Sequence, residues 1–239
     1  MTGGKGNFHR FNEVSNSRTL YLAQRAQLPR HKAGRYLIID NDNSITCPKE
    51  TFHYSIGVVS TNLESVFVWD SFVSLDARGR FIKSFGHSKM PSEISDFRTV
   101  EHFFTESRKN VVRGLHFQGL PHECSKIISI VRGSVSDFLF DMRVESSTFG
   151  CSQRIELQSD SPKSVYIPPG VAHGYFVHEE ETIVSYRQNR EFCPKCDSGI
   201  NPNMLSRFFD IDFTNAIISD RDYQLPGFED FQYTSNCDL

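Results

Sequence analysis

Short apolar runs recur along the chain from about residue 65 onward, and Gly, Pro, Asp and Ser separate them. Runs of about four to eight residues rich in Val, Ile and Phe are typical of β-strands, and few runs here are long enough for a helix. The pattern predicts an all-β sandwich or barrel, with a short helix around 91–97 or near the C terminus. The expected strands are 65–69, 81–85, 111–118, 126–132, 134–141, 152–157, 164–167, 174–177 and 182–187.

The first 60 residues have a different texture, because they are polar and are interrupted by Gly and Pro. Their short apolar run from Tyr36 to Ile39 precedes a turn-like Asp-Asn-Asp-Asn segment. We therefore predict an N-terminal extension of unknown role over 1–60, with at most a single strand, and a β domain over 61–239.

Side chains alternate across a strand, so Lys126 should share an inward, apolar face with Ile128 and Ile130. A lysine there is costly unless it has a partner or a task. Tyr186 should likewise point inward. The same alternation places Arg113 and His116 on opposite faces, so both can line one pocket only if a β-bulge intervenes, and Gly114 is the expected position.

Composition narrows the function. The chain has 239 residues, a net charge of −3 and a pI near 6.3, with no sustained basic run, so we expect no nucleic-acid or membrane partner. No apolar stretch approaches the length of a membrane span, and the polar start lacks the apolar core of a signal peptide. We expect a cytoplasmic protein.

The six cysteines are thinly spread, which fits reduced thiols better than a disulfide framework. Only Cys193 and Cys196 have metal-like spacing, and no second CxxC or HxxxH pair supplies the other two ligands of a structural zinc. We therefore expect a plain turn and no metal there, although a redox pair of these two cysteines stays open.

Five side chains suggest proton transfer on carbon. His116 lies in the run Arg-Gly-Leu-His-Phe-Gln, Lys126 follows in the next apolar run, and His173, Tyr186 and Asp222 come later. Together they offer a base, a cation, a proton donor and an orienting carboxylate, which is the set needed to move a proton beside a carbonyl. The set predicts an isomerase.

Several motifs resemble the dTDP-4-dehydrorhamnose 3,5-epimerase family, a branch of the cupin superfamily. They are DARGRF at 76–81, RGLHFQ at 113–118, the segment 125–150, SVYIPPGVAHGYFV at 164–177 and SDRD at 219–222. The resemblance covers about residues 65–225. It implies a cupin-type jelly-roll barrel, a homodimer, and action on a nucleotide-linked 4-keto-6-deoxy sugar without metal or organic cofactor.

The resemblance and the chemistry of the side chains assign the catalytic roles. His116 is expected to act as the base and Asp222 to hold its ring. Lys126 would stabilise the enolate oxygen, and Tyr186 would return a proton to the opposite face of the carbon. Arg78 and Arg113 match positions that grip a diphosphate, and His173 matches a pocket histidine. The expected substrate-binding residues are Arg78, Phe81, Arg113, Gln118, His173 and Phe192; the pair Asp141 and Arg143 is expected to brace the pocket.

A metal-dependent cupin oxygenase is a weaker alternative. The PGxxH spacing before His173 is also the second cupin motif, and His116, His122 and His173 could form a metal trio. The first cupin motif, however, normally carries HxH and a Glu, where this chain has His-Phe-Gln. We therefore expect no metal.

The chain departs from the family pattern near the nucleotide. Glu101 and Phe103 stand where the family commonly has Gln and Asn, and further departures occur at Lys83, Glu191 and Asn201. We predict an epimerase that inverts C3, C5 or both through an enolate, with the nucleotide and the sugar left open. The alternative is a cupin that binds a sugar nucleotide or a partner enzyme without turnover, with the N-terminal extension as a docking arm.

Overall fold

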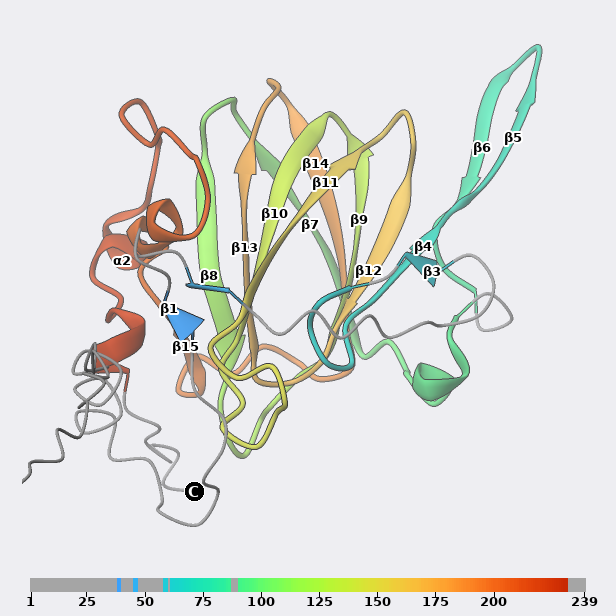
Figure 1. Ribbon diagram of the computed structural model, residues 1–239. Coiled ribbons are helices and arrows are strands. Elements are labelled where there is room, and N and C mark those ends of the chain that lie inside the picture. The colour runs from blue at the N-terminus through green and yellow to red at the C-terminus, as the bar shows by residue number, and fades with distance from the viewer. Residues whose placement is uncertain (1–37, 40–44, 47–57, 60, 87–89, 232–239) are drawn as a thin grey trace, which may run out of the picture.

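Two antiparallel sheets face each other and form a barrel-like β domain in this computed structural model (Figure 1). The structure describes residues 38–39, 45–46, 58–59, 61–86 and 90–231. The five-stranded sheet has the order β11 (Ser152–Gln158), β10 (Ser134–Asp141), β13 (Val171–Val177), β8 (Val112–Gln118), β15 (Asp197–Gly199). The six-stranded sheet has the order β3 (Val58–Val59), β4 (Phe67–Asp70), β12 (Lys163–Ile167), β9 (Lys126–Arg132), β14 (Thr182–Gln188), β7 (Glu101–Ser107).

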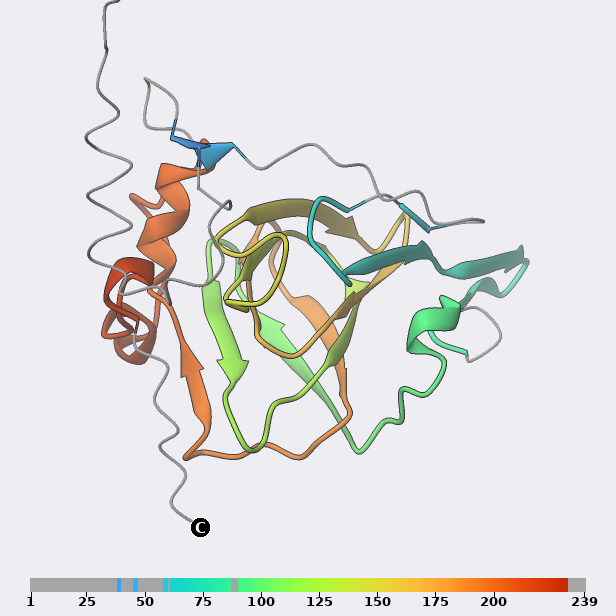
Figure 2. The ribbon, with the colours of Figure 1, turned by 60° about the horizontal axis from the view of Figure 1, so that its bottom comes forward.

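The remaining elements lie outside the two sheets. A hairpin of β5 (Phe72–Asp76) and β6 (Gly79–Lys83) projects away from the barrel, on the side opposite the C-terminal helices (Figures 1 and 2). A small pair of strands joins β1 (Ile38–Ile39) to β2 (Ile45–Thr46). The short helices are η2 (Ser92–Ile94), η3 (Pro202–Arg207), α2 (Asp220–Tyr223) and η4 (Phe228–Asp230).

The main core fills the space between the two sheets. It joins Ile128, Ile130 and Val184 of one sheet to Leu139 and Tyr175 of the other. A second core lies on the outer face of the five-stranded sheet, where the C-terminal segment 200–231 covers it with aromatic side chains. Burial of apolar surface on both faces of this sheet fixes the position of α2 beside β8, and this contact supplies a residue of the site.

The all-β prediction is confirmed, but three strands of the 61–239 domain were missed, and the first 60 residues contain β1, β2 and β3 where one strand was expected. β7 was not predicted because its sequence lacks a clear apolar run. Its outward residues include the polar His102 and Glu106, and its inward residues include Glu101. The very short β15 has no apolar signal, and β5, although its sequence FVSLD is apolar, lies exposed on a hairpin outside both sheets. The helix expected at 91–97 is a 3₁₀ turn, η2, and a short helix does occur near the C terminus.

The predicted bulge lies at Gly114. His116 pairs with His173 and Arg113 pairs with Tyr175, so one extra residue of β8 fits into this interval and places Arg113 and His116 on the same face. Gly114 has a φ of 109°, and a Cβ there would lie 2.6 Å from the carbonyl oxygen of His173. Only glycine fits this close approach.

The expectations for residues 1–60 lie mostly outside the described residues. Within that range the structure describes only the backbone of β1, β2 and β3, and β3 pairs with β4 at the edge of the six-stranded sheet. No helix of the described residues is long and apolar enough to cross a membrane.

Candidate active site

His116 and Asp222 form a hydrogen-bonded pair at the junction of β8 and α2. The Nε2 of His116 lies 2.7 Å from Oδ1 of Asp222, and Oδ2 of Asp222 accepts a hydrogen bond from the Gly114 N–H at 3.2 Å. Ser219 caps α2 by accepting the Asp222 N–H, which holds the start of the helix against β8. The bulge and the helix cap together therefore aim this pair.

The surroundings keep Asp222 ionised. Burial alone would raise its pKa, but the hydrogen bond and charge of His116, with the Gly114 N–H, lower the pKa below the ordinary value. An ionised carboxylate holds a proton on Nε2 of His116 and leaves Nδ1 free to accept one. The His116 side chain is 25% exposed, so a substrate can reach it.

Lys126 reaches from the six-stranded sheet toward the same strand. Its Nζ lies 3.5 Å from the carbonyl oxygen of His116, and among the described residues no carboxylate lies within ion-pair distance of it. Burial lowers the pKa of Lys126, opposed by Cys124 and Asp197. Its charge is therefore not engaged by a neighbouring acid and can meet a developing negative oxygen.

Tyr186 enters from the sheet that faces His116. Its ring stacks on Phe103 with centroids 4.8 Å apart, and it meets the ring of His173 edge-on at 5.8 Å. Burial raises the pKa of Tyr186 well above its ordinary value, with a further contribution from Tyr175. The phenol thus stays protonated at neutral pH, as a proton donor must.

A second histidine and aspartate pair lies beside the first and was missed in the sequence. Nε2 of His173 lies 2.6 Å from Oδ1 of Asp137, and both side chains are buried. Oδ2 of Asp137 is buried without a hydrogen-bond partner among the described atoms, and burial raises the pKa of this carboxyl. A signal did exist, because Asp137 shares the inward face of β10 with the apolar residues Val135 and Leu139.

The predicted substrate-binding residues do not all lie near His116. Arg113 is exposed and donates through Nε to Ser107 at 3.0 Å, on the inward face beside Tyr175. Gln118 is buried, and its amide bonds the backbone of His122 and Cys193, so its polar atoms serve two loops. Phe192 is exposed on the second of these loops. Their roles toward a substrate stay predictions.

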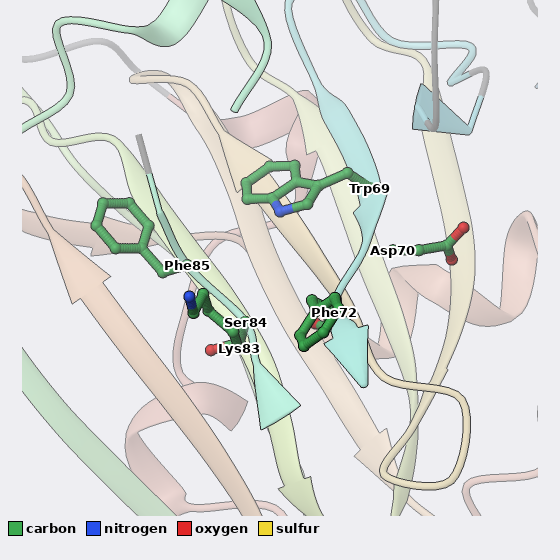
Figure 3. A pocket seen from close by; sticks show the side chains of 7 residues that line it. Trp69, Asp70, Phe72, Lys83, Ser84 and Phe85 are labelled. Atoms are coloured by element: carbon green, nitrogen blue, oxygen red, sulfur yellow. The ribbon is translucent and has the colours of Figure 1, made fainter. Parts of the chain in front are cut away.

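Arg78 and Phe81 lie on the projecting hairpin, remote from His116 in the same chain (Figure 1). Arg78 pairs with Asp76 at 2.5 Å, and Phe81 is 58% exposed. A pocket at the base of the hairpin contains none of the predicted catalytic residues (Figure 3). Its lining residues are Trp69, Asp70, Ser71, Phe72, Lys83, Ser84 and Phe85.

Other expectations change in the folded chain. Arg143 donates to Asp141 through two nitrogens, and Asp141 also accepts from the hydroxyls of Ser146 and Thr148, so the pair braces the turn after β10. The histidine trio weighed as a metal site does not form, because His116 and His173 each bind a carboxylate while His122 lies near Cys193. The expectation of reduced thiols is wrong for Cys151 and Cys196, which are each disulfide-bonded.

Comparison with known proteins identifies the family. The sequence profile of the dTDP-4-dehydrorhamnose 3,5-epimerase family matches residues 60–230. The chain belongs to this family. The dTDP-4-dehydrorhamnose 3,5-epimerase of Shigella flexneri is 29% identical over 179 residues, covering 74% of this chain and 99% of that protein. The dTDP-4-dehydrorhamnose 3-epimerase of Streptomyces niveus is 30% identical over 128 residues, covering 53% of this chain and 62% of that protein.

Solved structures agree with this assignment. The crystal structure of dTDP-4-dehydrorhamnose 3,5-epimerase from Sulfolobus tokodaii is 31% identical, with a TM-score of 0.64, and the match covers 74% of this chain and 99% of that chain. The predicted cupin-type jelly roll and the prediction of an epimerase, hence an isomerase, are confirmed. The findings favour the epimerase over a sugar-nucleotide-binding cupin without turnover.

Proposed function

We propose that the chain epimerises a dTDP-linked 4-keto-6-deoxy sugar at C3, C5 or both, with His116, Lys126, Tyr186 and Asp222 as its catalytic set. The observation that supports the proposal is the approach of Lys126 to the backbone of His116, together with the packing of Tyr186 against His173, which pairs with His116 on the next strand. The His116–Asp222 pair and the Lys126 ammonium meet at β8, while the Tyr186 phenol comes from β14.

His116 takes the proton from the carbon beside the keto group. Asp222 supports this step because its negative charge stabilises the imidazolium that forms. Such a base typically contributes ~10²–10⁴ in rate. The electrons of the broken C–H bond move onto the keto oxygen and give an enolate.

Lys126 stabilises that enolate oxygen. Burial lowers its pKa, but no carboxylate of the described residues pairs with it, so its ammonium form can offer its charge where negative charge develops. A Lys126→Met variant should lose about 10²–10³ in kcat, the usual loss for one such donor. Steady-state rates with a fixed sugar nucleotide measure this loss, and an unchanged kcat would contradict it.

Tyr186 returns a proton to the opposite face of the flattened carbon, and this return makes the exchange an inversion. Its high pKa and its stacking on Phe103 keep the hydroxyl protonated and fixed in orientation. We expect Tyr186→Phe to keep solvent exchange at one carbon but to lose the inverted product.

Solvent deuterium tests the whole sequence of steps. The protein is incubated with a 4-keto-6-deoxy sugar nucleotide in deuterated water, and NMR follows label at C3 and C5 and the configuration of the product. The parent should exchange and invert, His116→Ala should do neither, and His102→Ala, a change on the outer face of β7, should match the parent. Exchange that persists in His116→Ala would remove this histidine as the base.

The dTDP group is proposed from the activities of the relatives, which are dTDP-4-dehydrorhamnose 3,5- and 3-epimerases. Glu101 and Phe103 depart from the family pattern and lie on the inner side of β7, where Phe103 contacts Tyr186. A panel of dTDP-, GDP-, CDP- and UDP-linked 4-keto sugars decides the nucleotide. Faster exchange with any sugar other than the dTDP-linked one would overturn this part of the proposal.

A homodimer is part of the proposal, because Arg78 and Phe81 need a second copy to approach a site of this type. The hairpin that carries them exposes apolar side chains, with Leu75 72% and Phe72 53% exposed, which is costly in water. Light scattering should give a dimer for the parent and a monomer for Leu75→Asp. The control Val131→Asp, an exposed valine on β9, should stay dimeric, and a monomeric parent would contradict the proposal.

A cytoplasmic location is also proposed, because the relatives are epimerases of a sugar nucleotide, whose charged diphosphate does not cross a membrane unaided. The disulfides of Cys151 and Cys196 weigh against a strongly reducing compartment. Cell fractionation combined with thiol labelling distinguishes the cytoplasm from an oxidising compartment. Protein from a reducing cytoplasm should have free thiols at Cys151 and Cys196, so both should be labelled.

A further inference from the structure

Two loops far from each other in sequence bring a histidine and two cysteines together outside the catalytic set. His122 follows β8, and Cys193 and Cys196 precede β15. One ligand atom from each of the three lies within 4.8 Å of the others. His122 is exposed, Cys193 is half-buried and Cys196 is buried, so the cluster opens to solvent on its histidine side.

Gln118 and Gly119 hold this cluster in shape. The Gln118 amide donates to the carbonyl of His122 at 2.9 Å and accepts from the N–H of Cys193 at 2.6 Å. The Gly119 N–H donates to the carbonyl of Cys196 at 2.8 Å. The backbone of all three residues is therefore fixed to two consecutive positions at the end of β8, as in a preorganised ligand site.

The donor set suits zinc. One imidazole nitrogen and two sulfur atoms are typical of Zn²⁺ sites, and a tetrahedral shell places such atoms about 3.5–3.8 Å apart. The three atoms of the cluster already lie within 4.8 Å, and Sγ of Cys193 is 2.9 Å from Sγ of Cys196. Shifts of about 1 Å complete the geometry.

We propose that His122, Cys193 and Cys196 bind a Zn²⁺ ion once the disulfide of Cys196 is reduced. A reductant converts the disulfide to two thiols by supplying two electrons and two protons: a dithiol becomes a cyclic disulfide, and a phosphine takes oxygen from water and becomes a phosphine oxide. Zn²⁺ then displaces the thiol protons of Cys193 and Cys196 and takes a ring nitrogen of His122, with water in the fourth position.

The site would connect redox state to the catalytic strand. β15 leaves Cys196 directly and pairs with β8, with Gly199 opposite His116 and Asp197 opposite Gln118. A metal bound at the cluster would therefore fix the loop 189–196, which carries Phe192, against the strand that carries the base. Oxidation would release the metal and return the loop to its disulfide at Cys196 and its hydrogen bonds.

Zinc content of the full-length protein tests the proposal without any sugar substrate. The chain is reduced with a phosphine, incubated with ZnCl₂, freed of unbound metal and analysed for zinc, with an unreduced sample in parallel. We expect about one Zn²⁺ per reduced parent chain and none in the unreduced chain. Cys193→Ser and His122→Ala should lose the metal, and Co²⁺ in the reduced parent should give the absorption of a tetrahedral thiolate site.

Matched variants separate the site from unspecific binding. Cys124→Ser removes the other free thiol of the described residues and should retain zinc. Gln118→Glu keeps the acceptor for Cys193 but loses the donor to His122, so a competing chelator should report an affinity about 10–100-fold weaker. Equal zinc in the parent and Cys193→Ser overturns the proposal. A reduced parent that binds no zinc also overturns the proposal. So does the finding that Cys193 and Cys196 only form a disulfide with each other.

Discussion

Two histidine and aspartate pairs have their histidines on the adjacent strands β8 and β13, yet the surroundings of the pairs differ. The His116–Asp222 pair has side chains 25% and 5% exposed, whereas those of His173 and Asp137 are 3% and 0% exposed. The separations are nearly the same, 2.7 Å and 2.6 Å. The same two side-chain types can therefore serve different tasks according to burial and to the other hydrogen bonds of the carboxylate.

The two carboxylates differ most in their hydrogen bonds and in the direction of their pKa shifts. Asp222 receives a further N–H from Gly114 and has a lowered pKa, while Asp137 has a buried oxygen without a described partner and a raised pKa. Ionised Asp222 can stabilise an imidazolium, as a general base requires. The buried pair instead packs against the Tyr186 ring, where it can position the phenol.

The largest expected difference is in rate. Asp222→Asn should lower kcat by about 10²–10⁴, because an amide can no longer stabilise the protonated base. Asp137→Asn should lower it far less, since Asp137 does not bind the base. Deuterium exchange rates of the two variants test this difference, and equal losses would mean that both pairs act on the proton transfer.

Stability should show the reverse order. His173→Ala leaves Asp137 buried without its partner, which should lower the free energy of unfolding by about 3–5 kcal/mol. His116→Ala should cost only about 1 kcal/mol, because the pair is partly exposed and Asp222 keeps the Gly114 N–H. Urea unfolding monitored by circular dichroism gives both values. A parent-like midpoint for His173→Ala would show that the buried pair contributes little.

The smallest effect is a pH dependence of opposite sign. The lowered pKa of Asp222 contributes stability above its ordinary value of 3.8, and this contribution is lost as the pH falls below 3.8. The raised pKa of Asp137 contributes stability that is fully present below 3.8 and is lost as the pH rises through its folded value. Asp222→Asn should flatten the acid side of the curve and Asp137→Asn the side above 3.8. Urea unfolding at several pH values measures stability against pH for both variants. The same pH dependence in the two variants would contradict the expected difference between Asp222 and Asp137.

Much of the fold follows from local pattern. The strands with a clear apolar run, such as β9 and β10, were predicted within a residue or so, and so was the bulge at Gly114. β7 and β15 were not, because polar residues occupy positions whose burial depends on neighbouring strands. Asp137 was overlooked for a similar reason, since an acid on an inward face is informative only if its partner is known.

The sequence alone determined which side chains share a face of each regular strand, because alternation along a strand is a local property of the extended backbone; the bulge in β8 is the exception. On that basis Lys126 and Tyr186 were correctly placed toward the interior. Only the tertiary structure decided which side chains meet, such as His173 with Asp137 and His122 with Cys193. Such contacts depend on sheet register and on loops that packing brings together, and neither is encoded in the spacing of residues along the chain.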